Sequence, residues 1–235
     1  MPRKTMKTRM AEAVVSPGVE HALDGVLDHA LRLQRSVVVS YVDRLRSHPG
    51  ATPRSVIAGL EHRYLGSVAA IGAASGGAAA VPGVGTAVTV ASAVAEVAAF
   101  VEATAMFTLA VAEVHGYDLD DIETRRAFVL AVVLGDAGSL AVETAAVGGA
   151  HWAPLLARTV SREGIGNINK VLLRRFLTHF GARQGALALG RALPFGVGAG
   201  IGAVGNVALG RASVRAARRA FGPPPATLGP RVING

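Results

Sequence analysis

Cysteine is absent from all 235 residues of the chain, and aromatic residues make up only 5% of it. The absence of cysteine excludes disulfides, thiolate nucleophiles and cysteine-ligated zinc. Apolar residues make up 51% and 29 residues are glycine, so the apolar volume comes mainly from alanine, valine and leucine. Such small side chains favour close contact between backbones. Because a single core can grow to roughly 250 residues, we expect one domain.

Acidic residues are also absent from the C-terminal part of the chain, where none follows Glu163. That part holds ten basic residues, whereas residues 1–163 hold 14 basic and 16 acidic ones. The net charge of +8 therefore comes from the C-terminal part, which is the part that a polyanion would meet. The ten residues are Lys170, Arg174, Arg175, Arg183, Arg191, Arg211, Arg215, Arg218, Arg219 and Arg231.

A long apolar run is missing from the N-terminus. Four basic residues stand in the first ten positions, but AEAVVSPGVEHALDG follows and interrupts any apolar stretch, so we expect no secretory signal. We predict a basic flexible N-terminus over residues 1–15, a helical domain over 16–222 and a Pro/Gly-rich disordered tail over 223–235. The expected location is the cytoplasm, at the inner face of the cell membrane.

No run of alternating β-branched residues bounded by turns is present, so we predict an all-α fold of about seven or eight helices. Apolar residues recur at spacings of three and four through residues 16–48, with Ser16 as the cap and Pro17 in the first turn. This pattern indicates one amphipathic helix. Thr52 repeats the capping pattern before a second helix. That second helix is expected to run from residue 53 to a turn at Pro82. Further helices are expected over 86–114, 118–135, 140–150, 154–163, 167–180 and 185–220. We also expect a loop at 164–166 and a break in the chain's last helical region near Pro194.

The stretch GYDLDD predicts a helix end followed by a helix start. Gly116 is placed for a left-handed C-terminal cap, and Asp118 for an N-cap with Asp120 and Asp121 in the first turn. A calcium-binding loop is excluded, because Ile122 occupies the position of an oxygen ligand and a glutamate the position of the required glycine.

Two Gly/Ala-rich segments carry no charge, residues 64–95 and residues 192–210. Gly72 and Gly76 are four residues apart in the first segment, and Gly198 and Gly202 are four apart in the second. This spacing places each pair on one helix face, so we predict close helix packing at both.

The second segment also matches GxGxxA at Gly198, Gly200 and Ala203. A dinucleotide site needs a strand before this motif and an acid after it, and neither is present, so we reject that interpretation. As a helix, its nineteen residues would be ~28 Å long, close to the ~30 Å of a bilayer's hydrocarbon core. Its many glycines and Asn206 make insertion marginal on a transfer scale.

Basic residues flank this segment. Arg191 precedes it, and a basic ridge of Arg211, Arg215, Arg218 and Arg219 follows at positions i, i+4, i+7 and i+8. One helix face carries all four, and each is worth about 1 kcal/mol beside an anionic leaflet. We therefore predict contact with an anionic membrane; a solvated helix face is the alternative.

No catalytic constellation is present. The seven histidines form no HExxH pair, and Glu96, Glu102 and Glu113 lie in an apolar helix without a histidine at matching spacing. We expect no enzyme activity, no cofactor and no metal.

Several motifs are similar to those of the EcsC-like family of bacterial proteins. They are GYDLDD with Arg125, the glycine-rich AAAVPGVGTAV, and LPFGVGAGIGAVGN leading into a basic, alanine-rich helix. The resemblance covers most of residues 55–222 and implies a helical fold, membrane association and an unestablished biochemical role. The family's gene lies beside those of an ABC transporter. The matching motif residues are Gly116, Tyr117, Asp118, Asp120, Asp121, Pro194 and Asn206.

Three functions remain open at this point. The first is a non-enzymatic, membrane-associated protein, with a second protein in the membrane as a further partner. The second is a soluble bundle whose small-residue interior leaves a cavity for a lipid or other apolar ligand. The third is nucleic-acid binding, which we disfavour because few aromatics accompany the arginines and only phosphate attraction remains.

Overall fold

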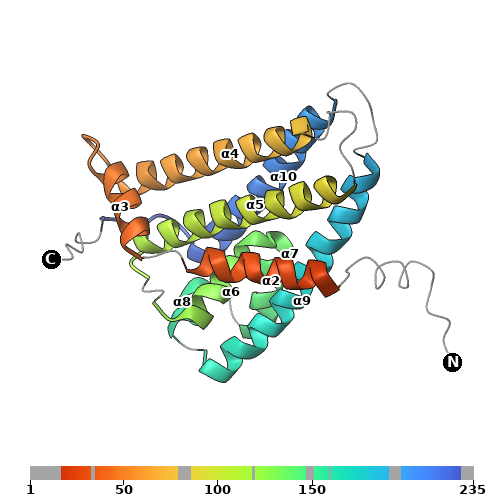
Figure 1. The fold of residues 1–235 in the computed structure, drawn as a ribbon. Helices are drawn as coiled ribbons and strands as arrows, with labels where there is room; N and C mark the ends of the chain where they lie inside the picture. The colour runs from red at the N-terminus through yellow and green to blue at the C-terminus, as the bar shows by residue number, and fades with distance from the viewer. Residues whose placement is uncertain are drawn as a thin grey trace.

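The computed structural model describes residues 17–32, 35–78, 86–117, 120–146, 151–158, 160–190 and 197–228. These residues form an all-α single domain of nine helices without a strand, which confirms the predicted fold class (Figure 1). In chain order they are α2 (Pro17–Leu31), α3 (Arg35–Arg46), α4 (Pro53–Ala78), α5 (Thr86–Val114), α6 (Ile122–Val133), α7 (Asp136–Ala146), α8 (Ala153–Arg158), α9 (Arg162–Gly190) and α10 (Val197–Phe221).

Helix α5 is the centre of the fold and contacts α2, α3, α4, α6, α9 and α10. Its segment Val94–Val114 has a mean hydropathy of 1.7, and within the described part of the chain no other helix is long and apolar enough to cross a membrane. About 61% of that segment is buried against the neighbouring helices. A helix that is apolar nearly all round is typical of a protein core as well as of a membrane span. We therefore regard α5 as the core helix of the domain.

Two predicted helix ends are present. Thr52 Oγ1 accepts a hydrogen bond from Ser55 N at 3.2 Å, and Thr52 N donates to Ser55 Oγ at 2.9 Å, so the two residues cap α4 reciprocally. Gly116 has a φ of 73°, and Tyr117 N donates to Ala112 O at 3.0 Å across the end of α5. This is the expected left-handed cap.

Several predicted boundaries are wrong. The helix expected over 16–48 is two helices, α2 and α3, because α2 ends at Leu31 in a turn in which Arg32 N donates to His29 O at 3.1 Å. Apolar spacing continues on both sides of this turn, so periodicity does not reveal it. Asp121 caps α6 in place of Asp118, which lies outside the described residues, and Asp120 and Asp121 therefore precede that helix.

The loop expected at 164–166 is also wrong. Ser161 Oγ accepts from Gly164 N at 3.2 Å, so α9 begins at Arg162 and its glycines lie in the first turns. Asn169 lies inside this helix, and its side chain donates to Glu123 O at 2.9 Å and so joins α9 to α6. Helix α7 begins before residue 140 because the chain turns at Gly135, whose φ is 63°, and α8 ends before residue 163.

The tail is ordered near α10. Residues 222–228 form no helix, but Leu228 packs against the core, in contrast to the disorder expected from residue 223 onward. The predicted flexible segment 1–15 and residues 229–235 lie outside the described residues.

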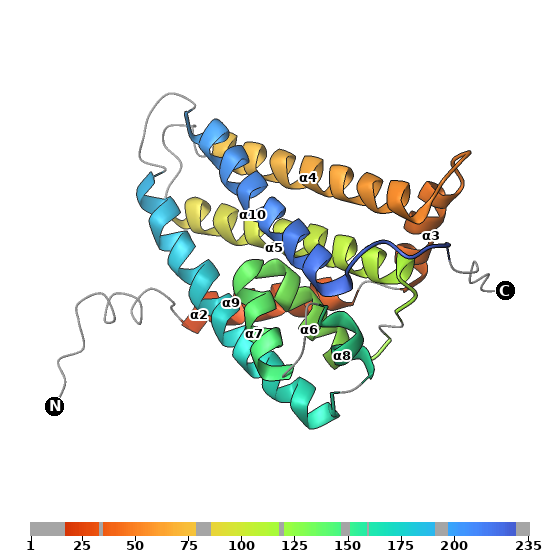
Figure 2. The same ribbon diagram turned by 180° about the vertical axis from the view of Figure 1, so that it is seen from behind.

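Four helix ends converge at one end of the molecule. Figures 1 and 2 show that the C-terminal ends of α4 and α9 lie beside the N-terminal ends of α5 and α10. We call residues 66–78, 86–95, 186–190 and 197–210 the small-residue end. None of these residues is charged.

The Gly/Ala-rich helices α4 and α10 pack against each other along their length, and this is the most extensive helix contact of the fold. The two helices approach closely at Gly210, where an added Cβ would lie 2.8 Å from Val68 Cγ2. Gly72 is buried on α4, and Gly76, Gly198 and Gly202 lie within α4 and α10. Close packing in these segments was predicted from the sequence, but the tight contact at Gly210 was not.

Candidate functional site

The basic ridge of α10 is largely paired with carboxylates of other helices. Arg218 donates to both carboxylate oxygens of Glu61 on α4, at 2.7 and 2.5 Å, and these bonds raise the pKa of the Arg218 guanidinium. Arg215 lies 3.0 Å and Arg219 3.6 Å from Asp136 on α7. The ridge is exposed, but two carboxylates neutralise half of its charge.

Arg211 is the exception in the ridge. It is exposed and forms no ion pair within the described ranges. Gly210 packs against Tyr64 and Leu65, so Arg211 lies at the level of Arg63 on α4. Arg63 is likewise exposed, and its side chain has no ionic partner among the residues that the structure describes. We call Arg63 and Arg211 the basic rim.

Within the small-residue end, beyond the basic rim, α4 and α10 expose only uncharged side chains. Val204 on α10 is 72% exposed, which is the largest exposed fraction among the large hydrophobic residues described. The other exposed residues of this surface are Gly66, Ser67, Ala70, Ala73, Ala74 and Ala208. This surface and the basic rim form the candidate membrane contact.

Several resemblance-motif residues have structural roles. The carboxylate of Asp121 accepts from Thr124 N at 2.8 Å and from Thr124 Oγ1 at 2.7 Å, which lowers the pKa of Asp121. The ring of Tyr117 contacts Phe128 and Phe221, and burial raises the pKa of its phenol. Asn206 is fully buried on α10, and Asp120 is exposed. Arg191 and Pro194 lie outside the described residues.

The acids of α5 do not gather into a metal site. Glu102 lies 3.3 Å from His29 Nε2, Glu96 is buried, and Glu113 accepts from Arg46 NH2 through its backbone oxygen at 3.5 Å. Within the described residues, no three His, Asp or Glu side chains lie close enough together to hold a metal ion.

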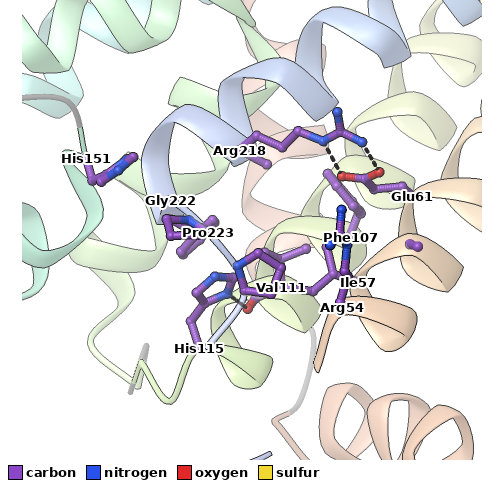
Figure 3. Close-up of a pocket in the computed structure, with 14 residues that line it drawn as sticks. Arg54, Ile57, Glu61, Phe107, Val111, His115, His151, Arg218, Gly222 and Pro223 are labelled. Carbon is purple, nitrogen blue, oxygen red and sulfur yellow. Dashed lines mark hydrogen bonds and ion pairs between the residues drawn. The ribbon is translucent and has the colours of Figure 1, made fainter. Parts of the chain in front are cut away.

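A pocket of about 460 Å³ lies at the opposite end of α4, α5 and α10 from the small-residue end. Its wall joins the first turns of α4, the last turns of α5 and α10, and the segment 222–224. Figure 3 shows the Arg218–Glu61 pair at one end of this pocket and His115 toward the other. The pocket was not predicted from the sequence, because its lining residues come from four separate parts of the chain.

No protein-family model matches the chain, and neither does any curated protein or solved structure. The function is therefore argued from the geometry.

Proposed function

We propose that this chain is a non-enzymatic, peripheral membrane protein that inserts its small-residue end into one leaflet and places its basic rim among anionic headgroups. The observation that carries this proposal is the convergence of four uncharged helix ends at one end of the domain. We further propose that it is a bacterial protein of the EcsC-like type, at the inner face of the cell membrane, where a second membrane protein is a further partner.

The lengths of α4 and α10 suit insertion into one leaflet. Arg211 lies fourteen residues after Val197, and Arg63 lies fifteen residues before Ala78, which corresponds to ~21 and ~22 Å of helix at ~1.5 Å per residue. One leaflet contributes about 15 Å of hydrocarbon, followed by the headgroup region. Full insertion of the small-residue end therefore brings both arginines to headgroup level.

The charge pattern favours anionic lipid. A basic residue close to an anionic surface contributes about 1 kcal/mol, and this attraction weakens with salt. Arg63 and Arg211 carry that contribution because neither is engaged by a carboxylate in the described structure. Arg215, Arg218 and Arg219 contribute less, since Asp136 and Glu61 offset two of their three charges.

Flotation of the full chain with liposomes tests the proposal. Wild-type protein is expected to float with phosphatidylglycerol vesicles at low salt, and less with phosphatidylcholine vesicles. The double variant Arg63→Gln/Arg211→Gln is expected to lose most of this binding. Arg44→Gln/Arg174→Gln removes the same charge from exposed positions on α3 and α9 and is expected to float normally.

A second pair of variants tests the apolar contact. Val204→Asp introduces a charge into the proposed contact, whereas Val171→Asp does so at a 48% exposed valine on α9. Only Val204→Asp is expected to reduce flotation. Wild-type protein that stays at the bottom of the gradient, or equal losses for the two valine variants, contradicts the proposal.

A further inference from the structure

The pocket between α4, α5 and α10 has the size and lining of a small-molecule site. Its volume of about 460 Å³ lies within the range of roughly 300–1,000 Å³ that is typical of ligand pockets. Ile57, Phe107, Val111 and Phe221 supply an apolar lining. Phe107, Val111 and Phe221 are nearly completely buried, so the apolar part of the wall is held by the core.

One polar atom in the wall lacks a hydrogen-bond partner. His115 Nδ1 lies 2.9 Å from Val111 O, and because a carbonyl oxygen only accepts, the proton of the neutral ring is on Nδ1. The lone pair on Nε2 is then an acceptor. That atom is buried, and no described group hydrogen-bonds to it. A buried acceptor without a donor is costly, so a ligand hydroxyl that reaches Nε2, once the ring shifts to open this atom to the pocket, would gain affinity.

One arginine in the pocket wall has no ion-pair partner among the described residues. Arg54 lines the pocket from the first turn of α4, is exposed, and forms no ion pair in the described part of the chain. By contrast, Arg218 is held by Glu61 through two hydrogen bonds. His151 is fixed through Nδ1 to Arg219 O at 3.1 Å. Arg54 is therefore the group in this wall that is free to bind a ligand anion.

We propose that this pocket binds an amphiphilic hydroxy carboxylic acid. The carboxylate pairs with Arg54 and the hydroxyl donates to His115 Nε2, two residues labelled in Figure 3. The hydrocarbon chain lies against Phe107 and Phe221 of the lining. No bond is made or broken in the ligand. This binding site is separate from the membrane contact, which lies at the other end of the same helices.

Calorimetric titration of the full chain with 3-hydroxydecanoate, without vesicles and below the micelle concentration, tests the assignment. Saturable binding of one molecule per chain is expected. Arg54→Gln is expected to weaken it by about tenfold or more, because a charge-assisted hydrogen bond is lost. Arg44→Gln, at an exposed position on α3 outside the pocket, is expected to change the affinity by less than about twofold.

The role of His115 is tested by comparing ligands. Wild-type protein is expected to bind 3-hydroxydecanoate about fivefold more tightly than decanoate, the gain from one hydrogen bond. His115→Phe keeps a ring against Phe221 but removes Nε2, so this variant is expected to bind the two acids equally. A preference for the hydroxy acid that survives in His115→Phe overturns the assignment of Nε2.

A variant that fills the pocket tests whether the ligand binds there. Ala58 is exposed at the pocket wall, so Ala58→Trp fills the space without disturbing the core, whereas His62→Trp changes an exposed residue outside it. Binding is expected to be lost only in Ala58→Trp. No saturable binding to wild-type protein, or unchanged binding to Ala58→Trp, overturns the proposal. The Val204→Asp variant is expected to retain acid binding, so failure at this site is distinct from failure of membrane binding.

Discussion

At Gly210, α10 lies so close to α4 that the absence of a single methyl group determines the contact. An added Cβ would lie 2.8 Å from Val68 Cγ2 and 3.2 Å from Leu65 Cδ2, whereas a Cβ at Gly66 would meet nothing within 4 Å. Both glycines are inside helices. The same substitution therefore has opposite expected effects at the two positions.

We predict that Gly210→Ala lowers the free energy of unfolding by about 1–3 kcal/mol, because the helices must separate or shift. Gly66→Ala is expected to raise it by about 0.5–1 kcal/mol, since alanine is the better helix former and no contact is disturbed. Urea unfolding followed by circular dichroism measures both. Stabilisation by Gly210→Ala would mean that α4 and α10 do not pack as closely as described.

Tyr64 joins α4 to α5 through one buried hydrogen bond. Its hydroxyl lies 2.8 Å from Thr104 Oγ1, and Thr104 donates in turn to Phe100 O at 2.7 Å, so the tyrosine hydroxyl is the donor to the threonine. Burial raises the pKa of Tyr64 to about 12. Because the phenol in the unfolded chain ionises near the ordinary value of 10.0, the unfolded state loses its proton first as the pH rises.

This difference predicts how stability depends on pH. Tyr64 contributes fully below about pH 10, and between about pH 10 and 12 the free energy of unfolding falls by about 1.4 kcal/mol per pH unit on its account. Urea unfolding of wild-type and Tyr64→Phe protein across this range isolates the contribution, because other groups titrate equally in both. Parallel pH profiles for the two proteins would show that Tyr64 is not buried as described.

At the scale of the helix, α6 depends on the residue that caps its first turn. Asp121 accepts from both polar groups of Thr124, and these hydrogen bonds lower the pKa of the aspartate. Asp121→Ala is expected to lower the stability by about 1 kcal/mol and Asp121→Asn by a smaller amount, because asparagine also caps helices.

The lowered pKa of Asp121 also gives this cap a pH dependence. Because the pKa falls on folding, the wild-type protein is expected to be more stable than the Asp121→Asn variant above pH 3.8, the ordinary value for the carboxyl. That advantage is expected to disappear as the pH falls through the pKa of the folded state. Thermal unfolding at neutral and acidic pH checks both expectations. Equal melting temperatures for the wild type and the alanine and asparagine variants would contradict the cap.

The ends of helices could be predicted from the sequence where neighbouring residues alone determine them. Thr52 and Gly116 mark helix ends through their own hydrogen bonds and φ, so the sequence located those ends correctly. The glycines near Ser161 suggested a loop because glycine disfavours helix, yet the serine cap and packing against α6 override that preference. The apolar spacing of α2 continues into α3, so the sequence did not reveal that α2 ends at Leu31.

The candidate sites required contacts between distant parts of the chain. The helical spacing of the ridge arginines at 211–219 could be recognised in the sequence. Their ion pairs could not, because Arg218 and Glu61 are 157 positions apart and Arg215 and Asp136 are 79 positions apart. Whether Arg63 has a carboxylate partner depends on how α10 packs along α4. The pocket forms only because the ends of three helices meet. Spacing within one segment cannot predict either arrangement.

At the scale of the whole molecule, the chain separates two kinds of surface. Uncharged residues occupy the end where α4, α5, α9 and α10 meet, and the pocket with its two histidines and Arg54 lies at the far ends of three of them. Because α5 is covered by its neighbours, the membrane contact that we propose is an edge of a folded domain and not a spanning helix.

The chain has no native cysteine, so one label can be placed at a chosen depth. Val204→Cys and Val171→Cys, each carrying an environment-sensitive fluorophore, report on the proposed contact and on an exposed control. With phosphatidylglycerol vesicles that contain a quencher on the lipid chains, the label at 204 is expected to shift to the blue and be quenched, and the label at 171 to stay unchanged. An unquenched label at 204 on protein that has bound the vesicles would contradict insertion of the small-residue end.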